Sequence, residues 1–370
     1  MVLTPNPRVV LAKNPSYELP VAGEHIVYDP SPTIDLDLKL NGGFLTKTLL
    51  LSPEPYMRER IRDASIESYS TPMQVGQPLV GFGLVLVLRS EKEGVKAGDY
   101  MYGFTPWEAY TVQPYMDART EYKNFPAYTF DMDSLVLQPV PNPEGAFPWT
   151  RYCSCIGAPG LTAFIGLEHL APDAKAGQTI YVSSGASGVG RLKTIGSAST
   201  DAKVEYMRSV GADVAFNYKT TPVAAALAEH GPIDLFFDNV GGEQLEAALE
   251  NMNFKGRVIS CGAIAEYNIP NDQRYGIKNM SIMFKRRIRL EGFIVADTPE
   301  YNTRFFTEIP PLVAQGKITG QEQLFAGLER GPEAFLSMFD GKSTAKPVVV
   351  VDRIWIMNPT LYYSRIPHNP

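Results

Sequence analysis

A glycine-rich turn behind a strand-like run limits most strongly what this chain can fold into. The run Thr179 to Ser183 has the character of a buried β-strand and leads directly into Gly185-Ala-Ser-Gly-Val-Gly190. Glycines at such a turn let the backbone approach a phosphate, and a helix that starts there points its first N–H groups at the anion. The strand and the turn together predict a parallel sheet that binds a dinucleotide.

The segment behind this turn is too short for the helix that normally follows. The next strand-like run, Leu192 to Ala198, begins after Arg191, whereas a parallel crossover takes about ten residues or more. Two outcomes are open. Residues 189–199 form the crossover helix and the second strand is lost, or Leu192 to Ala198 stays a strand that an irregular path reaches, which leaves no helix N-terminus at the pyrophosphate.

Composition excludes several classes of partner. The chain has 370 residues and a net charge of −6, which argues against nucleic acid and against an acidic membrane surface. Its one basic cluster, Lys285 to Arg289, is interpreted as a solvated helix end or loop rather than as an anion site. No signal peptide or apolar run of membrane length occurs, so we expect a cytoplasmic protein.

The cysteines and histidines predict no metal site. Only Cys153, Cys155 and Cys261 occur, too few for a disulfide framework, and the four histidines are scattered without metal-ligand spacing. Cys153 and Cys155 are interpreted as packed thiols rather than as a redox or metal pair, because cysteine is commonly buried.

The pattern along the chain predicts two domains of an α/β protein. Residues 1–140 consist of short strand-like runs with Gly and Pro between them, as in a barrel or sandwich. Residues 141–314 alternate strand and helix, which is typical of a doubly wound parallel sheet. Residues after about 310 look helical as far as Phe339, and a final strand at Lys346 to Val351 lets residues 315–351 complete the first domain. Residues 352–370 are expected to be a loose tail.

Seven short motifs identify a family by their order. Over residues 5–351 the chain resembles the zinc-independent medium-chain dehydrogenases/reductases, specifically the group of leukotriene B4 12-hydroxydehydrogenase, prostaglandin reductase and the alkenal double-bond reductases. The resemblance implies an N-terminal GroES-like β-barrel domain and a doubly wound Rossmann domain that lacks its first crossover helix. The motifs are Pro55-Tyr-Met-Arg58, Gly103-Phe-Thr-Pro-Trp107, Gly157-Ala-Pro-Gly-Leu-Thr-Ala163, Asp201-Ala-Lys-Val-Glu-Tyr206, Phe216-Asn-Tyr-Lys219, Phe237-Asp-Asn-Val-Gly-Gly242 and Cys261-Gly-Ala-Ile-Ala-Glu-Tyr-Asn268.

The resemblance also implies a reaction. Family members reduce the carbon–carbon double bond of an α,β-unsaturated aldehyde or ketone by hydride transfer from NADPH to the β-carbon. The oxygen of the resulting enolate needs a hydrogen-bond donor placed beforehand, and Tyr267 matches the tyrosine that the family places there. Tyr56 matches a tyrosine that lines the substrate pocket. For Tyr56 the alternative stays open that it packs in a core with its hydroxyl bonded.

The end of the second strand favours NADPH over NADH. An NAD site carries Asp or Glu there, but this chain has small and hydroxyl residues, followed by Lys203 within a helical turn. The resemblance assigns Lys203 and Tyr218 to the 2′-phosphate, although a solvated helix lysine is the alternative for Lys203. The full set of expected cofactor-binding residues is Gly185, Ser187, Gly188, Val189, Gly190, Lys203, Tyr218, Asn239, Cys261, Gly262, Ala263, Ile264, Phe293, Ile294 and Val295.

Three functions remain to be weighed. The first is the NADPH-dependent reductase of a small-molecule enone or alkenal, with a homodimer, paired around the strand of Phe293, expected from the resemblance. The second is a pseudoenzyme, or a splice or gene-model variant, that no longer binds the dinucleotide because the crossover is short. The third keeps the enzyme and reverses its direction, so that it oxidises an allylic alcohol with NADP⁺.

Overall fold

The protein consists of two compact units. The computed structural model describes residues 3–66, 68–114, 136–142, 145–184, 192–341 and 343–352. One unit comprises residues 1–159 and 306–370, the other residues 160–305, where the sequence placed the boundaries near 140 and 315. Trp149 and Tyr152 explain why the first unit extends further along the chain, because both are buried in its hydrophobic core.

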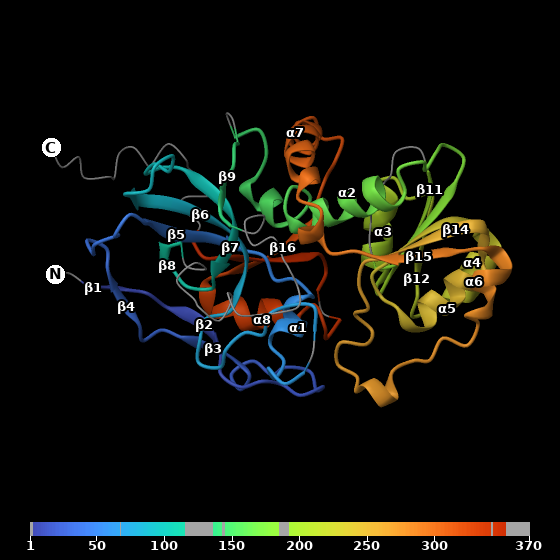
Figure 1. The fold of residues 1–370 in the computed structure, drawn as a ribbon, viewed down its shortest axis with the longest axis horizontal. Coiled ribbons are helices and arrows are strands. Elements are labelled where there is room, and N and C mark those ends of the chain that lie inside the picture. Colours follow the sequence, from blue (N-terminus) through green and yellow to red (C-terminus); the bar gives the residue numbers. More distant parts are fainter. Residues whose placement is uncertain are drawn as a thin grey trace. The chain divides into compact units, whose positions relative to one another are not determined.

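Figure 1 shows the helices and strands of both units, coloured along the sequence. Helices α2 (Ala158–Leu170) and α7 (Glu300–Ala314) each contain a boundary between the units. The first unit holds β1 (Leu3–Pro5), β2 (Arg8–Leu11), β3 (Ile26–Asp29), β4 (Thr33–Asp35), β5 (Phe44–Leu51), α1 (Met57–Arg60), β6 (Val80–Ser90), β7 (Tyr100–Pro106), β8 (Tyr110–Gln113), β9 (Gln138–Pro139), β16 (Glu322–Ala326), α8 (Gly331–Leu336) and β17 (Lys346–Val350). The second unit holds β10 (Thr179–Val182), β11 (Lys193–Ala198), α3 (Asp201–Ser209), β12 (Val214–Asn217), α4 (Val223–His230), β13 (Ile233–Asp238), α5 (Gly242–Glu250), β14 (Met252–Ser260), α6 (Ser281–Arg286) and β15 (Arg289–Gly292).

The first unit is built on a seven-stranded sheet. Its strand order is β16-β17-β5-β6-β7-β9, and β8 also pairs with β5. The expected final strand is confirmed as β17, which pairs antiparallel with β5. Two smaller pairs, β1 with β4 and β2 with β3, complete the described strands of this unit. That the sheet closes as a GroES-like barrel stays a prediction.

The segment expected to be helical from about 310 to Phe339 is helical only in part, in α7 and again in α8. Helix α7 ends at Ala314, and β16 pairs parallel with β17. Gly316, at a φ of +69°, takes the left-handed conformation that commonly ends a helix. Arg151 then fixes the start of β16, because its Nη1 donates to the carboxylate of Glu322 at 2.6 Å and to the backbone oxygen of Gly320. An apolar pattern alone does not reveal such a polar anchor.

The second unit contains the predicted doubly wound sheet. All its strands run parallel in the order β12-β11-β10-β13-β14-β15. Strand β11 pairs with β10 from Thr179 opposite Lys193 to Val182 opposite Gly196. The outcome in which the second strand is lost is therefore wrong. Residues 185–191, which contain the glycine-rich turn, lie outside the described residues.

Helices pack on both faces of this sheet. On one face Tyr181 and Phe236 belong to a core with α4 and α5, and on the other Ile180 and Val182 pack with Leu170 of α2. The hydroxyl of Tyr181 is buried but bonded, at 2.9 Å to Ser197 Oγ and 2.8 Å to Gln244 Oε1. Strand β11 is therefore held by hydrogen bonds as well as by apolar contacts.

Other local expectations are confirmed or corrected. The basic cluster lies at the end of α6, where Arg287 takes the left-handed conformation, and Cys153 is a buried free thiol as expected. Strand β15 ends at Gly292, before Phe293, and Val295–Asp297 forms a 3₁₀ turn. Within the described ranges, no helix has the length and apolar character to cross a membrane.

Candidate functional site

The carboxyl ends of β10 and β13 meet where the strand order of the sheet reverses. Ser183 follows β10, and Asn239 follows β13. The backbone N–H of Asn239 donates to Ser183 Oγ at 2.9 Å, and its side-chain Nδ2 donates to the backbone oxygen of Ser183 at 2.7 Å. Doubly wound sheets bind ligands at this reversal, so the structure places the predicted residue Asn239 at the expected edge.

The end of β14 joins the same junction. The N–H groups of Cys261 and Gly262 both donate to the backbone oxygen of Asp238, at 2.9 Å and 3.0 Å. The N–H of Ile264 donates to the backbone oxygen of Asn239 at 3.2 Å. Four consecutive predicted residues, Cys261, Gly262, Ala263 and Ile264, therefore lie beside Asn239 at one edge of the sheet.

Burial controls the chemistry of Cys261. Burial first, and then the charge of Asp238, raises the pKa of this thiol to about 12. The thiol is therefore protonated at neutral pH and is a poor nucleophile. Its place in the site is that of a small apolar side chain.

Tyr267 lies on the loop that continues from this segment. A Cβ added to Gly262 would lie 3.2 Å from the Tyr267 hydroxyl oxygen, so the hydroxyl approaches the backbone at the one position that lacks a side chain. The N–H of Glu266 donates to the backbone oxygen of Ala263 at 2.8 Å and turns the loop back. The predicted catalytic hydroxyl and the predicted cofactor segment are thus neighbours.

Lys203 lies in the first turn of α3, which follows β11, and Tyr218 directly follows β12. Thr200 caps α3 by accepting the N–H of Lys203 at 3.3 Å, and the N–H of Tyr218 donates to the backbone oxygen of Ala198 at 3.0 Å. Burial, and then the positive charge of Lys219, lowers the pKa of Lys203. In the part of the chain that the structure describes, neither lysine forms an ion pair. Two neighbouring cations that form no ion pair suit an anionic ligand.

The predicted cofactor-binding residues that follow β15 are Phe293, Ile294 and Val295. The Phe293 ring meets the Phe237 ring edge to face at 6.4 Å, and a Cβ on Gly166 of α2 would lie 3.0 Å from Phe293 Cζ. Phe293 therefore belongs to the apolar contacts between α2 and the sheet. Ile294 precedes the 3₁₀ turn that Val295 begins.

Tyr56 lies in the other unit, just before α1. Its ring stacks on Phe104 at 6.3 Å and meets Phe82 at 6.4 Å. Its hydroxyl is buried, and burial raises the pKa of Tyr56, whereas Arg60 and the backbone of Phe82 lower it. Both interpretations of Tyr56, as a pocket tyrosine and as a core tyrosine with a bonded hydroxyl, therefore stay predictions.

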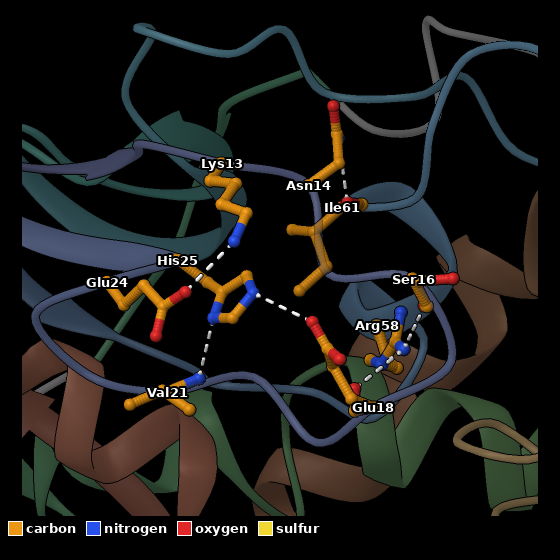
Figure 2. A network of polar contacts seen from close by, with 9 residues as sticks. All are labelled: Lys13, Asn14, Ser16, Glu18, Val21, Glu24, His25, Arg58 and Ile61. Atoms are coloured by element: carbon orange, nitrogen blue, oxygen red, sulfur yellow. Dashed lines mark hydrogen bonds and ion pairs between the residues drawn. The ribbon is translucent and has the colours of Figure 1, made fainter.

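A loop from Lys13 to His25, here called the strap, is tied to the chain around α1 (Figure 2). Arg58 Nη2 donates to the backbone oxygens of Ser16 and Glu18, at 2.8 Å and 3.2 Å. Asn14 Nδ2 donates to the backbone oxygen of Ile61 at 2.9 Å. Arg58 follows Tyr56 by two residues, so the strap and Tyr56 share one support.

Two further groups of predictions concern the glycine-rich turn and a metal site. The expected phosphate-binding residues Gly185, Ser187, Gly188, Val189 and Gly190 lie outside the described residues. Among the residues that are described, no group of three or more His, Cys, Asp or Glu side chains could hold a metal ion. The described side chains therefore do not fit a zinc site, and we derive no chemical step through a metal.

Sequence reasoning missed Asp238. Its Oδ1 accepts the N–H groups of Val240 and Gly241, at 3.0 Å and 2.9 Å, and lies 3.4 Å from Ser183 Oγ. The side chain is 1% exposed. A carboxylate at the end of a predicted central strand, directly before Asn239, is the signal that could have identified it.

Known proteins resemble this chain in sequence and in fold. Residues 180–309 match the family model of zinc-binding dehydrogenases, and residues 33–120 match that of the N-terminal domain of oxidoreductases. An NADP(+)-dependent 2-alkenal reductase of Nicotiana tabacum is 35% identical over 84% of this chain and 87% of its own. A (+)-pulegone reductase of Mentha piperita is 31% identical over 85% and 92%. The crystal structure of CurA from Vibrio vulnificus in complex with NADPH is similar with a TM-score of 0.76 and 27% identity, over 94% of this chain and 99% of that one.

Proposed function

The chain belongs to the zinc-binding dehydrogenases, the medium-chain dehydrogenase/reductase family of oxidoreductases, and from this we propose that it reduces the carbon–carbon double bond of α,β-unsaturated aldehydes or ketones with NADPH. Relatives at 35% and 31% identity bear the names of reductases of this kind. The substrate class is inferred from those names. The proposal for the cofactor has support from the chain itself.

One observation carries the proposal. The ends of β10, β13 and β14 are joined by the hydrogen bonds of Ser183, Asn239 and Cys261 at the reversal of strand order. This is where a doubly wound sheet binds a dinucleotide. Lys203 and Lys219, which have no ion pair among the described residues, supply positive charge for a 2′-phosphate. Arrangement and charge therefore both fit NADPH.

The residues of the site would act by orientation and by hydrogen bonding. Bound NADPH supplies the hydride for the β-carbon of the substrate. Negative charge then develops on the carbonyl oxygen, and the hydroxyl of Tyr267 would donate a hydrogen bond to it. A donor that is in place beforehand stabilises this charge without reorganisation of solvent. The protonated thiol of Cys261 adds no competing nucleophile.

Turnover tests the proposal. Purified full-length protein should consume NADPH when 2-alkenals or cyclic enones are added, with the saturated carbonyl compound as product. Allylic alcohols with NADP⁺ form the second arm, and a faster reaction there would reverse the assigned direction. Protein that binds NADPH but reduces no enone contradicts the proposed reaction while the cofactor assignment stands.

We also propose that the protein is a homodimer. Strand β15 is at one edge of the six-stranded sheet, and edge strands offer unpaired backbone groups to another chain. Leu290 on this strand and Phe284 on α6 are exposed apolar side chains, at 37% and 73%. Sedimentation should show a dimer for the wild type and a monomer for Leu290→Glu. A monomeric wild type would contradict this proposal.

A further inference from the structure

We propose that Asp238 is a positioning residue of the dinucleotide site, whose carboxylate holds the turn after β13 against the end of β10 while its backbone oxygen holds the end of β14. The inference rests on the proposed function and adds to it a residue that the predicted site did not contain. Asp238 is the last residue of β13, at the reversal of strand order.

The side chain of Asp238 shapes the turn that follows β13. Oδ1 accepts both the Val240 and the Gly241 N–H. Gly241 has a φ of +73°, a left-handed conformation that a residue with a side chain adopts only under strain. The carboxylate therefore stabilises a turn that the backbone alone would hold weakly, and Asn239 lies inside this turn.

The neighbours of Asp238 extend this support to both adjacent strands. Ser183 Oγ, 3.4 Å from Asp238 Oδ1, accepts the N–H of Asn239. On the other side, the backbone oxygen of Asp238 accepts the N–H groups of Cys261 and Gly262. One residue thus connects the strand end that precedes the glycine-rich turn with the segment that leads to Tyr267.

Burial of the Asp238 carboxylate is energetically costly, which favours a functional role for it. Burial, and then the charge of Glu266, raises the pKa of Asp238, and the partners that lower it are neutral N–H and hydroxyl groups. No cation among the described residues forms an ion pair with it. A buried carboxylate that has hydrogen bonds but no ion pair costs stability, and functional sites commonly contain such groups.

The shortened crossover gives this role particular weight. Ser183 precedes Gly185 by two residues, and the described bonds of its side chain run to residues 237–239. Ser183, which precedes the glycine-rich turn, is therefore held from the side of β13.

Asp234 provides a matched control on the same strand. Its Oδ2 accepts the Thr179 N–H at 2.8 Å, and its Oδ1 accepts Asn253 Nδ2 at 2.8 Å. It thus also joins β10 and β14, but at the opposite end of the sheet from Asn239. A purely structural role predicts similar consequences for the two aspartates.

The experiment compares Asp238→Ala, Asp238→Asn and Asp234→Ala in the full-length protein. Each variant is titrated with NADPH by fluorescence and melted without ligand. We expect Asp238→Ala to weaken NADPH binding about tenfold or more, because a misplaced site loses its preorganisation. Asp238→Asn should recover part of the loss, since its amide oxygen can still accept both N–H groups. Asp234→Ala should lower the melting temperature and leave the dissociation constant within about twofold of the wild type.

Each result decides between the interpretations. Equal NADPH binding by Asp238→Ala and the wild type overturns the inference alone, as does an equal loss of affinity in Asp234→Ala. If Asp238→Ala does not fold, Asp238→Asn and Ser183→Ala replace it, and unchanged affinity in both overturns the inference. A wild type that does not bind NADPH overturns the proposed function, and the inference with it.

Discussion

At the scale of single residues, the hydroxyl of Tyr267 is the group to which the proposed reaction assigns catalysis. Its oxygen lies beside Gly262, in the segment that Asp238 and Asn239 hold at the edge of the sheet. Because this segment is fixed by backbone hydrogen bonds, removal of the hydroxyl alone should leave the rest of the site intact.

We therefore expect Tyr267→Phe to lower kcat about 100-fold, the typical cost of losing one donor to a developing oxyanion. NADPH affinity should not change. Tyr275→Phe is the matched control, since its hydroxyl bonds Glu246 at 2.9 Å and should change kcat less than about threefold. Steady-state kinetics with one enone measure both variants. Equal rates for Tyr267→Phe and the wild type would remove Tyr267 from the mechanism.

A second prediction concerns the choice between NADPH and NADH. Lys203→Met should weaken NADPH binding about tenfold and NADH binding hardly at all, because only NADPH carries the 2′-phosphate. Lys193→Met is the control, since Lys193 Nζ bonds the backbone oxygen of His230 at the other end of the sheet. Titration of each variant with both cofactors decides. An equal loss for NADH and NADPH would show that Lys203 does not read the phosphate.

The pKa of Lys203 gives this prediction a pH dependence. Burial and Lys219 lower that pKa below its usual value, so the free enzyme loses this charge as the pH rises through the lowered pKa. NADPH affinity should fall over that alkaline range in the wild type and stay flatter in Lys203→Met. The stability of the free protein changes with pH in the opposite direction. It rises over this range, because the lysine of the unfolded chain keeps its proton to a higher pH than the lysine of the folded protein.

The sequence predicts which residues form the site more fully than it predicts the hydrogen bonds between them. The motifs identified Asn239, the segment from Cys261 and Tyr267, and the structure brings these residues together. Asp238 was missed because its role depends on hydrogen bonds between strands that are distant in sequence. A strand pattern shows where a carboxylate stands but not which N–H groups it accepts.

At the scale of elements, the strap is held by hydrogen bonds from a buried arginine. Arg58 is 3% exposed and bonds two backbone oxygens of the strap. Both of these partners are backbone carbonyl groups, of Ser16 and Glu18. The strap and α1 therefore stabilise each other, and Tyr56 directly precedes α1.

Arg58→Met should destabilise the protein by about 2–3 kcal/mol, because it leaves two carbonyl groups without their donor. Lys13→Met is the control in the same loop, since Lys13 forms an exposed ion pair with Glu24 (Figure 2) and should leave the unfolding midpoint unchanged. Urea unfolding measures both. Limited proteolysis should show new cleavage in the strap of Arg58→Met alone. Equal stability of the two variants would contradict the anchoring role of Arg58.

Elements with regular apolar periods could be predicted, and those set by tertiary contacts could not. The strands and helices of the second unit follow the sequence pattern closely, including β11 after the short crossover. Strand β16 was missed because Arg151, Gly316 and Gly320 determine its position from outside the strand.

At the scale of the whole molecule, the sheet order β12-β11-β10-β13-β14-β15 is that of a complete doubly wound fold. The short connection between β10 and β11 has not removed a strand. The junction of Ser183, Asp238 and Asn239 is present, and so are the two lysines at the end of the sheet. These observations favour a protein that still binds its cofactor over a pseudoenzyme.

Titration of the full-length wild type with NADPH tests this account most directly. Enhancement of nicotinamide fluorescence should saturate at one NADPH per chain, with a dissociation constant on the order of micromolar, about 8 kcal/mol of binding free energy. NADH should bind more weakly. The absence of saturable NADPH binding by folded protein would contradict the account and favour the pseudoenzyme.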